Sequence, residues 1–128
     1  MKNPTAETVV LVGASDDPER YAHKALVSLL KHGHHVIPVH PRLTDIGGLP
    51  VLASLEEVTG PVDTVTLYVG PKISAGLLGD LVKLSPRRVI FNPGAENPLL
   101  AQELAKAGIA SEEACTLVLL ASGQFSNP

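Results

Sequence analysis

A short turn near the start of the chain has the residues of a phosphate-binding loop. Gly13, Ala14 and Ser15 follow the apolar, β-branched run 8–12, and a segment with helical periodicity begins soon after them. Between a buried strand and a helix, such a turn holds anions through backbone N–H groups and the positive end of the helix dipole. The pattern predicts phosphate binding at this turn, although a glycine that only permits a tight turn would give the same sequence.

The spacing of the turn differs from that of the dinucleotide fingerprint G-x-G-x-x-G. Gly13, Ser15 and Pro18 occupy its three glycine positions. Serine at the second position keeps the backbone N–H and adds a hydroxyl donor, but it crowds a closely laid pyrophosphate. We therefore expect phosphate binding to be retained and the NAD geometry to be weakened. We also expect Gly13→Val to block binding with little loss of fold.

Basic residues near this turn favour a polyanionic ligand. Arg42 follows the second apolar run, where an NAD-binding chain carries an acidic residue for the ribose hydroxyls. A guanidinium prefers phosphate, which suggests a ligand with phosphate on its ribose, as in NADP or coenzyme A (CoA); a solvated surface cation is the alternative. Arg20, Tyr21 and Lys24 lie at the entry to the first helix, where a bound polyanion would offset the unfavourable effect of cations on the helix dipole.

Apolar runs alternate with helical stripes along the chain. Strands are predicted at 8–12, 35–39, 64–69 and 88–91, a strand or buried segment at 116–120, and helices at 22–30, 73–82 and 99–105. This alternation predicts an α/β protein: a three-layer, Rossmann-like, doubly wound parallel sheet of about five strands. We expect one domain over residues 1–128, with a core at 7–121 and a loose tail at 122–128. The expected strand order is 3-2-1-4-5.

In an open parallel sheet, ligands bind outside the carboxyl ends of the strands. The residues that follow the predicted strands are Gly13, Ala14 and Ser15; His40, Pro41 and Arg42; Val69, Gly70 and Pro71; and Asn92, Pro93 and Gly94. These four clusters are the candidate ligand-binding residues.

Composition limits the partners that this chain can have. Hydrophobic residues make up 45%, aromatic residues 3%, and the net charge is −3, so no basic, aromatic-rich surface indicates nucleic acid. The single cysteine, Cys115, excludes an internal disulfide and fits a reducing compartment. No apolar run approaches the ~20 residues that cross a bilayer. We expect a soluble, cytoplasmic protein that acts on no membrane.

Three other chemistries are considered and set aside. Five histidines lie between residues 23 and 40, but no second cysteine or carboxylate arrangement completes a set of metal ligands. Asp16 and Asp17 follow a strand, as in response-regulator receivers, yet Asp63 stands at the start of its strand and not at the carboxyl end. Cys115 has no recognisable base beside it. We expect no metal and no catalysis by this chain alone.

The sequence resembles the small, stand-alone CoA-binding domain proteins, which are similar to the nucleotide-binding domain of the succinyl-CoA synthetase α subunit. The matching segments, within 7–115, are Val12–Ser15, Pro18–Arg20, Ala22–His23, Val36–Arg42, Ser54–Leu55, Pro61–Asp63 and Ala107–Ile109. The resemblance implies phosphates at the first loop, adenosine at the second and the pantetheine arm at the third. By position, these roles fall on Gly13, Ala14, Ser15, Arg20 and Lys24; on His40, Pro41 and Arg42; and on Val69, Gly70 and Pro71.

The predicted function is binding of CoA or acyl-CoA, with the chain serving as a carrier, sensor or partner module. The alternatives are an NADP-binding oxidoreductase fragment and a ligand-free interaction module. The chain has no second domain to bring a substrate to a nicotinamide, which disfavours the oxidoreductase. The expected partner is a nucleotide-like small molecule, and a protein partner or homo-oligomer stays open.

Overall fold

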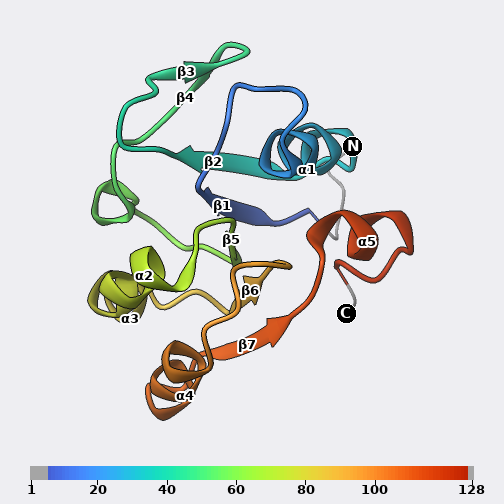
Figure 1. The fold of residues 1–128 in the computed structure, drawn as a ribbon. Coiled ribbons are helices and arrows are strands. Elements are labelled where there is room, and N and C mark those ends of the chain that lie inside the picture. The colour runs from blue at the N-terminus through green and yellow to red at the C-terminus, as the bar shows by residue number, and fades with distance from the viewer. Residues whose placement is uncertain (1–5, 127–128) are drawn as a thin grey trace.

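A five-stranded parallel sheet forms the centre of the molecule, shown in Figure 1 as a computed structural model that describes residues 6–126. Its strands are β1 (Thr8–Val12), β2 (His35–Val39), β5 (Thr64–Leu67), β6 (Arg88–Phe91) and β7 (Ala110–Glu113), and a small hairpin pairs β3 (Asp45–Ile46) with β4 (Leu49–Pro50). The helices are α1 (Tyr21–Lys31), α2 (Pro71–Ser74), α3 (Leu78–Leu84), α4 (Pro98–Lys106) and α5 (Thr116–Ala121).

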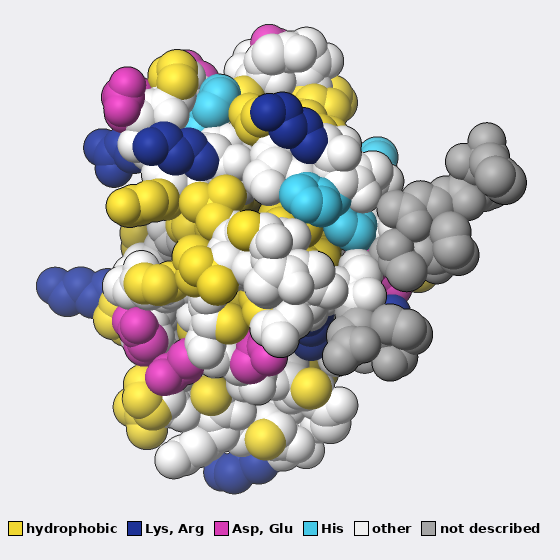
Figure 2. Space-filling view, turned by 90° about the vertical axis from the view of Figure 1, so that its right-hand side faces the viewer, with side chains coloured by type: hydrophobic (Ala, Val, Ile, Leu, Met, Phe, Trp, Pro, Cys, Tyr) yellow, Lys and Arg dark blue, Asp and Glu magenta, His cyan; other side chains and the backbone are white. Residues whose placement is uncertain are grey.

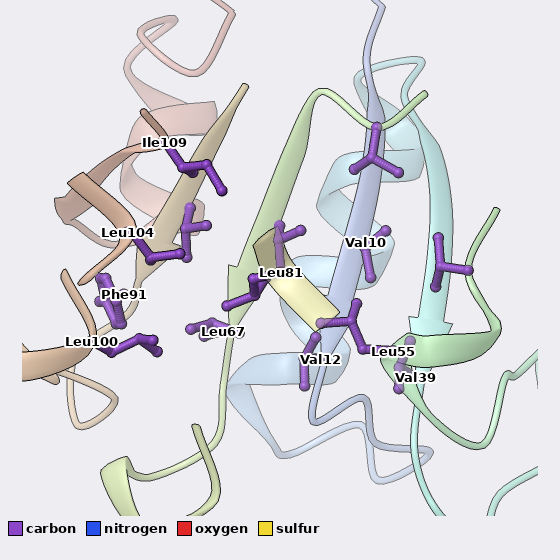
Figure 3. Packing of buried hydrophobic residues seen from close by; sticks show 14 of the residues in the cluster. Val10, Val12, Val39, Leu55, Leu67, Leu81, Phe91, Leu100, Leu104 and Ile109 are labelled. Carbon is purple, nitrogen blue, oxygen red and sulfur yellow. The ribbon is translucent and has the colours of Figure 1, made fainter. Parts of the chain in front are cut away.

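Helices cover both faces of the sheet, which confirms the predicted three-layer α/β fold (Figure 1). Successive side chains of a strand point to opposite faces. Val9 and Leu11 accordingly pack in one core cluster with residues of α1 and α5. Val10 and Val12 pack in the other cluster with residues of α3 and α4, as Figure 3 shows. An aliphatic core therefore fills both spaces between the sheet and its helices.

The first helix forms from a regular apolar stripe. Ala22, Ala25, Leu26 and Leu29 recur at helical spacing and are all buried against the sheet. Gly33, two residues after the last helical residue, takes a φ of 85°. This left-handed conformation ends the helix, as the sequence predicts.

The predicted strand order is wrong. The observed order is β2-β1-β5-β6-β7, so that β5 pairs with β1 and not beyond β2. Pro38 lies in β2 and has no N–H to donate to a second neighbour. A strand with an internal proline belongs at the edge of a sheet, which is where β2 lies, with a single bridge to Leu52 beyond it. The strand order therefore reverses between β1 and β5.

Two predicted elements near the C-terminus are also corrected. The apolar run at 116–120 is helix α5, and the fifth strand is the polar segment Ala110–Glu113. A short apolar run cannot be assigned to strand or helix by periodicity alone.

The predicted helix at 73–82 is interrupted by a 3₁₀ turn at Ala75–Leu77 that contains Gly76. Glycine is a poor helix former, which accounts for the break between α2 and α3.

The connection between β2 and β5 contains no long helix. It carries the β3–β4 hairpin and a 3₁₀ turn at Leu55–Glu57, in which Leu55 is buried. The side chain of Ser54, which precedes this turn, accepts no capping hydrogen bond. The N–H of Glu57 instead donates to the carbonyl of Ser54 at 3.1 Å.

The C-terminal segment is better ordered than the sequence predicts. Phe125 is only 3% exposed and lies with its ring centre 5.0 Å from that of His34. The guanidinium carbon of Arg88 lies 4.5 Å from the centre of the same ring. The expected loose tail at 122–128 is therefore wrong for Phe125, and residues 127–128 lie outside the described part.

Across residues 6–126, no helix combines the length and the apolar character needed to span a bilayer. Figure 2 shows the side of the molecule that carries α1 and α5, where hydrophobic side chains reach the surface with basic groups above and acidic groups below them. Val27 and Leu30 of α1 and Val118 of α5 are exposed apolar residues. Helices that cover a sheet commonly expose single apolar residues, and these three need no separate explanation.

Candidate functional site

A cleft of about 1190 Å³ opens at the carboxyl ends of β1, β2 and β5. It is lined by the loop that leads into α1, by the turn after β2 and by the residues that follow β5. This place is the point at which the strand order reverses, and open α/β sheets bind their ligands there. The cleft therefore lies at the junction of β1 and β5.

Gly13 is required by the packing of that junction. Its φ is 88°, and a Cβ atom would lie 2.9 Å from the carbonyl oxygen of Tyr68 and 2.9 Å from Cγ1 of Val69. Both the left-handed conformation and the contact exclude a side chain. The expectation that Gly13→Val leaves the fold intact is therefore wrong, because the turn itself requires glycine at this position.

The backbone donors of the loop begin later than the sequence suggests. The N–H groups of Gly13 and Ala14 both donate to the carbonyl of Val39 at 3.1 Å. The N–H groups of Ser15 and Asp16, by contrast, have no acceptor within the described region. Gly13 and Ala14 shape the floor of the cleft, and Ser15 and Asp16 carry the free donors.

The start of α1 adds further donors. Lys24 is the first residue of the helix whose N–H finds a helical carbonyl, that of Arg20 at 3.1 Å, so the N–H groups of the first turn are unpaired within the helix. No acidic residue lies in that turn, and no side chain caps it. Tyr21 and Ala22 of this turn line the cleft. The positive end of the helix dipole is thus open to an anion.

The loop between β1 and α1 is braced by its own side chains. The hydroxyl of Ser15 accepts from the N–H of Asp17 at 3.1 Å, and a carboxylate oxygen of Asp17 accepts from the N–H of Glu19 at 3.0 Å. Nδ1 of His23 lies 2.9 Å from the carbonyl oxygen of Ser15 and ties the loop to α1. These bonds hold the free N–H groups in place without a ligand.

Charged side chains of both signs line the cleft: Arg20, Arg42, Asp16, Asp17, Glu19 and Asp80. Two guanidinium groups against four carboxylates do not make the cleft basic. A polyanion bound there depends on directional N–H donors and on individually placed arginines. Attraction by net charge contributes little.

The predicted site residues divide into two groups. Those that line the cleft are Gly13, Ala14, Ser15, Arg20, Tyr21, His40, Pro41, Arg42 and Val69. Those that lie outside its lining are Lys24, Gly70, Pro71, Asn92 and Gly94. The ammonium of Lys24 lies 5.7 Å from the ring centre of Tyr21, so Lys24 contacts a residue that lines the cleft without lining it itself. Gly70 and Pro71 form the start of α2.

Asn92 is a core residue, and its expected place in the site is corrected. Its side chain is fully buried, and Nδ2 donates to Oγ1 of Thr66 at 2.6 Å and to the carbonyl of Leu67 at 2.9 Å. Its Oδ1 accepts from the N–H of Thr116 at 2.9 Å. The amide thus joins β5 to the start of α5 and has no group left for a ligand. Gly94 lies in a turn with a φ of 91°, and its N–H donates to the Glu96 carboxylate at 2.9 Å.

Sequence reasoning missed an apolar wall on the α2–α3 side. The residues there are Tyr68, Ile73 and Leu77, which line the cleft beside Val69. Ile73 is 61% exposed and faces the cleft, and no local sequence pattern places it there. The hydroxyl of Tyr68 is buried and lacks a hydrogen-bond partner among the described residues, and burial raises the pKa of Tyr68 to about 12.

A second hollow, of about 460 Å³, lies at the opposite end of the sheet beside Arg88. Nε of Arg88 donates to Thr64 at 2.8 Å, and Nη2 donates to the carbonyl of Phe125 at 2.6 Å and to Glu7 at 3.3 Å. Nη1 donates to Glu112 at 3.4 Å, so this guanidinium joins β5, β7, Glu7 and the C-terminal segment. Within residues 6–126, no group of three or more His, Cys, Asp or Glu side chains is placed to hold a metal ion.

Known proteins share this fold and much of this sequence. A crystal structure of an uncharacterized protein is 38% identical, with a TM-score of 0.89 over 94% of this chain and 98% of that one. A Thermus thermophilus structure, cell-free ID.343, is 30% identical, with a TM-score of 0.86 over 94% of this chain and 91% of that one. The uncharacterized protein YneT of Bacillus subtilis (strain 168) is 32% identical over 63 residues, which span 49% of this chain and about half, 47%, of that relative.

The match to a protein family extends over more of the chain than the match to the Bacillus subtilis relative. It includes the loop after β1, the turn after β2 and the segment after β5, which together form the cleft. The sequence profile of the CoA binding domain family matches residues 7–121, nearly the whole described chain, and the protein is a member of that family.

Proposed function

We propose that this chain binds CoA or an acyl-CoA in the cleft between β1 and β5 and acts as a binding module without catalysis of its own. The observation that carries the proposal is the row of free N–H groups, at Ser15, Asp16 and the first turn of α1, along a cleft that Arg42 also lines. CoA carries a pyrophosphate and a separate ribose phosphate, and the cleft offers two separate places for phosphate.

The pyrophosphate fits the loop and the start of α1. Anions at a helix N-terminus accept from N–H groups that have no other partner and gain from the helix dipole. The Ser15 hydroxyl accepts from Asp17 and keeps its own hydrogen for a ligand oxygen. Because the loop is braced internally, binding costs little ordering of this segment.

The ribose phosphate fits Arg42. Its guanidinium makes no hydrogen bond or ion pair with any other residue in 6–126. A guanidinium without a protein partner is available for bidentate contact with a phosphate. The apolar wall of Tyr68, Ile73 and Leu77, with Val69 beside it, suits the long pantetheine arm, because the methylene groups of that arm need apolar contact.

Calorimetry with four nucleotides tests this proposal. We expect CoA to bind more tightly than 3′-dephospho-CoA by about tenfold or more, because a hydrogen bond to a charged group contributes about 1.5–3 kcal/mol. We also expect CoA to bind more tightly than NADP or NAD. Tighter binding of NADP would overturn the proposal in favour of a nicotinamide nucleotide.

Arginine variants locate the contact. Arg42→Ala is expected to bind CoA and 3′-dephospho-CoA equally. The matched control is Arg87→Ala, because Arg87 is exposed and paired with Asp63 at the other end of the sheet. The control should keep the full difference between the two ligands. If the wild-type protein itself binds both ligands equally, Arg42 has no role in phosphate recognition.

A further inference from the structure

The side chain of His40 closes the turn that carries Arg42. Nδ1 of its imidazole accepts from the N–H of Arg42 at 3.0 Å and from the N–H of Leu43 at 3.1 Å. One ring nitrogen therefore satisfies two consecutive amides, as the side-chain oxygen of Asn or Asp does in an Asx turn. The backbone of His40 is held separately, because its N–H donates to the carbonyl of Leu52 at 3.0 Å.

Both ends of this turn are anchored, and its middle is not. His40 is fixed to the sheet through Leu52, and the side chain of Leu43 packs against the core cluster on the α1 face. Between them, Arg42 is exposed and its guanidinium has no partner in the described structure. The conformation of the turn sets where the Arg42 side chain leaves the backbone and so which part of the cleft its guanidinium can reach.

We propose that His40 is a positioning residue that sets the place of the Arg42 guanidinium and so makes recognition of the ligand's ribose phosphate possible. This inference rests on the proposed function, in which Arg42 contacts that phosphate. The imidazole performs the role only when it is neutral with its proton on Nε2, because Nδ1 must offer a lone pair. A side chain without an acceptor at this position leaves both amides unpaired and the turn free to change conformation.

Charged groups surround His40, and a test variant must leave them in place. Arg42 lies in the turn itself, and Asp45 follows in β3. The charged side chains across the cleft are Asp16, Asp17, Glu19 and Arg20 from the loop before α1, and Asp80 from α3. His40→Asn keeps all of these groups and still offers a side-chain acceptor to the two amides.

The test compares His40→Ala with His40→Asn in the full chain. Without ligand, NMR hydrogen exchange at the Arg42 and Leu43 amides should be fast in His40→Ala and slow in His40→Asn. The wild type should protect both amides as His40→Asn does. The matched control is His35→Ala, which removes an exposed histidine at the start of β2, the strand that precedes His40. This control should behave as the wild type.

Ligand binding then separates positioning from local structure. The preference for CoA over 3′-dephospho-CoA should fall about tenfold in His40→Ala and stay within about twofold of wild type in His40→Asn. Lost amide protection with an unchanged preference would overturn the positioning role. Failure of His40→Asn to restore either amide protection or the preference would do the same.

The same data distinguish this inference from the proposed function. If the wild-type protein shows no preference for CoA over 3′-dephospho-CoA, the phosphate contact of Arg42 fails, and the positioning role fails with it. If the wild type shows the preference and His40→Ala retains it in full, the proposed function stands and only the role of His40 is overturned.

Discussion

Replacement of Asn92 by alanine should destabilise the fold and leave ligand affinity unchanged. The side chain is fully buried, and its amide makes three hydrogen bonds, to Thr66, Leu67 and Thr116. The Thr66 hydroxyl keeps a second partner, the hydroxyl of Thr116 at 2.8 Å. The Leu67 carbonyl likewise keeps the backbone N–H of residue 92, at 3.4 Å. The substitution therefore leaves chiefly one buried backbone group without a partner, the N–H of Thr116.

The size of the effect follows from that group. An unsatisfied buried group costs about 1–3 kcal/mol, so the free energy of unfolding should fall by about 2 kcal/mol. The free energy of unfolding of a domain of this size is about 5–15 kcal/mol, so the variant should still be folded at low temperature. Urea unfolding followed by far-UV circular dichroism measures the loss, and calorimetry with CoA measures affinity.

The matched control for Asn92→Ala removes an amide from an exposed helical position. Gln102→Ala on α4 is exposed and should change stability by less than about 0.5 kcal/mol. A loss below about 1 kcal/mol in Asn92→Ala, together with markedly weaker CoA binding in the folded variant, would refute the assignment of Asn92 to the core. It would return this residue to the ligand site that the sequence suggested.

Three further predictions concern stability and use urea unfolding. Gly13→Ala should cost about 2–4 kcal/mol, because a positive φ is strained for alanine and its Cβ would meet the Tyr68 carbonyl; an unchanged midpoint would contradict the contact. Burial lowers the pKa of His34, whose Nδ1 accepts from the N–H of Glu7 at 3.0 Å. His34 therefore takes up a proton more readily in the unfolded chain than in the folded one. The free energy of unfolding should be highest above about pH 6.5 and should fall as pH drops below that value, and His34→Asn should flatten this dependence. Phe125→Ala should cost about 3 kcal/mol, as expected of a buried ring, and a loss below about 0.5 kcal/mol would show the C-terminal segment to be loose.

The central strands were predictable because burial on both faces leaves a strong mark on sequence. The runs at 8–12, 64–67 and 88–91 are almost entirely buried, and a parallel sheet gives them no polar face. Strand β7 was not predictable in this way, since Ala110–Glu113 is polar and forms at the edge by pairing with β6. The strand order had a signal that was overlooked, the proline within β2.

The position of the site was predictable, and its donors were not. The rule that ligands bind at the carboxyl ends of strands identified the loop after β1, the turn after β2 and Val69. The hydrogen bonds of Gly13 and Ala14 to Val39 join segments far apart in sequence, so no local pattern reveals that their N–H groups are used. The same holds for Asn92, whose three partners come from β5 and from α5.

An NMR titration of the ¹⁵N-labelled protein with CoA tests the central claim most directly. We predict saturable shifts of the amide signals of Ser15, Asp16, Tyr21 and Arg42, the residues that offer free donors or line the cleft. The amide of Arg88, at the opposite end of the sheet, should not move. Saturable shifts centred on Arg88, or no saturable shifts at any CoA concentration, would contradict the binding of CoA at the junction of β1 and β5.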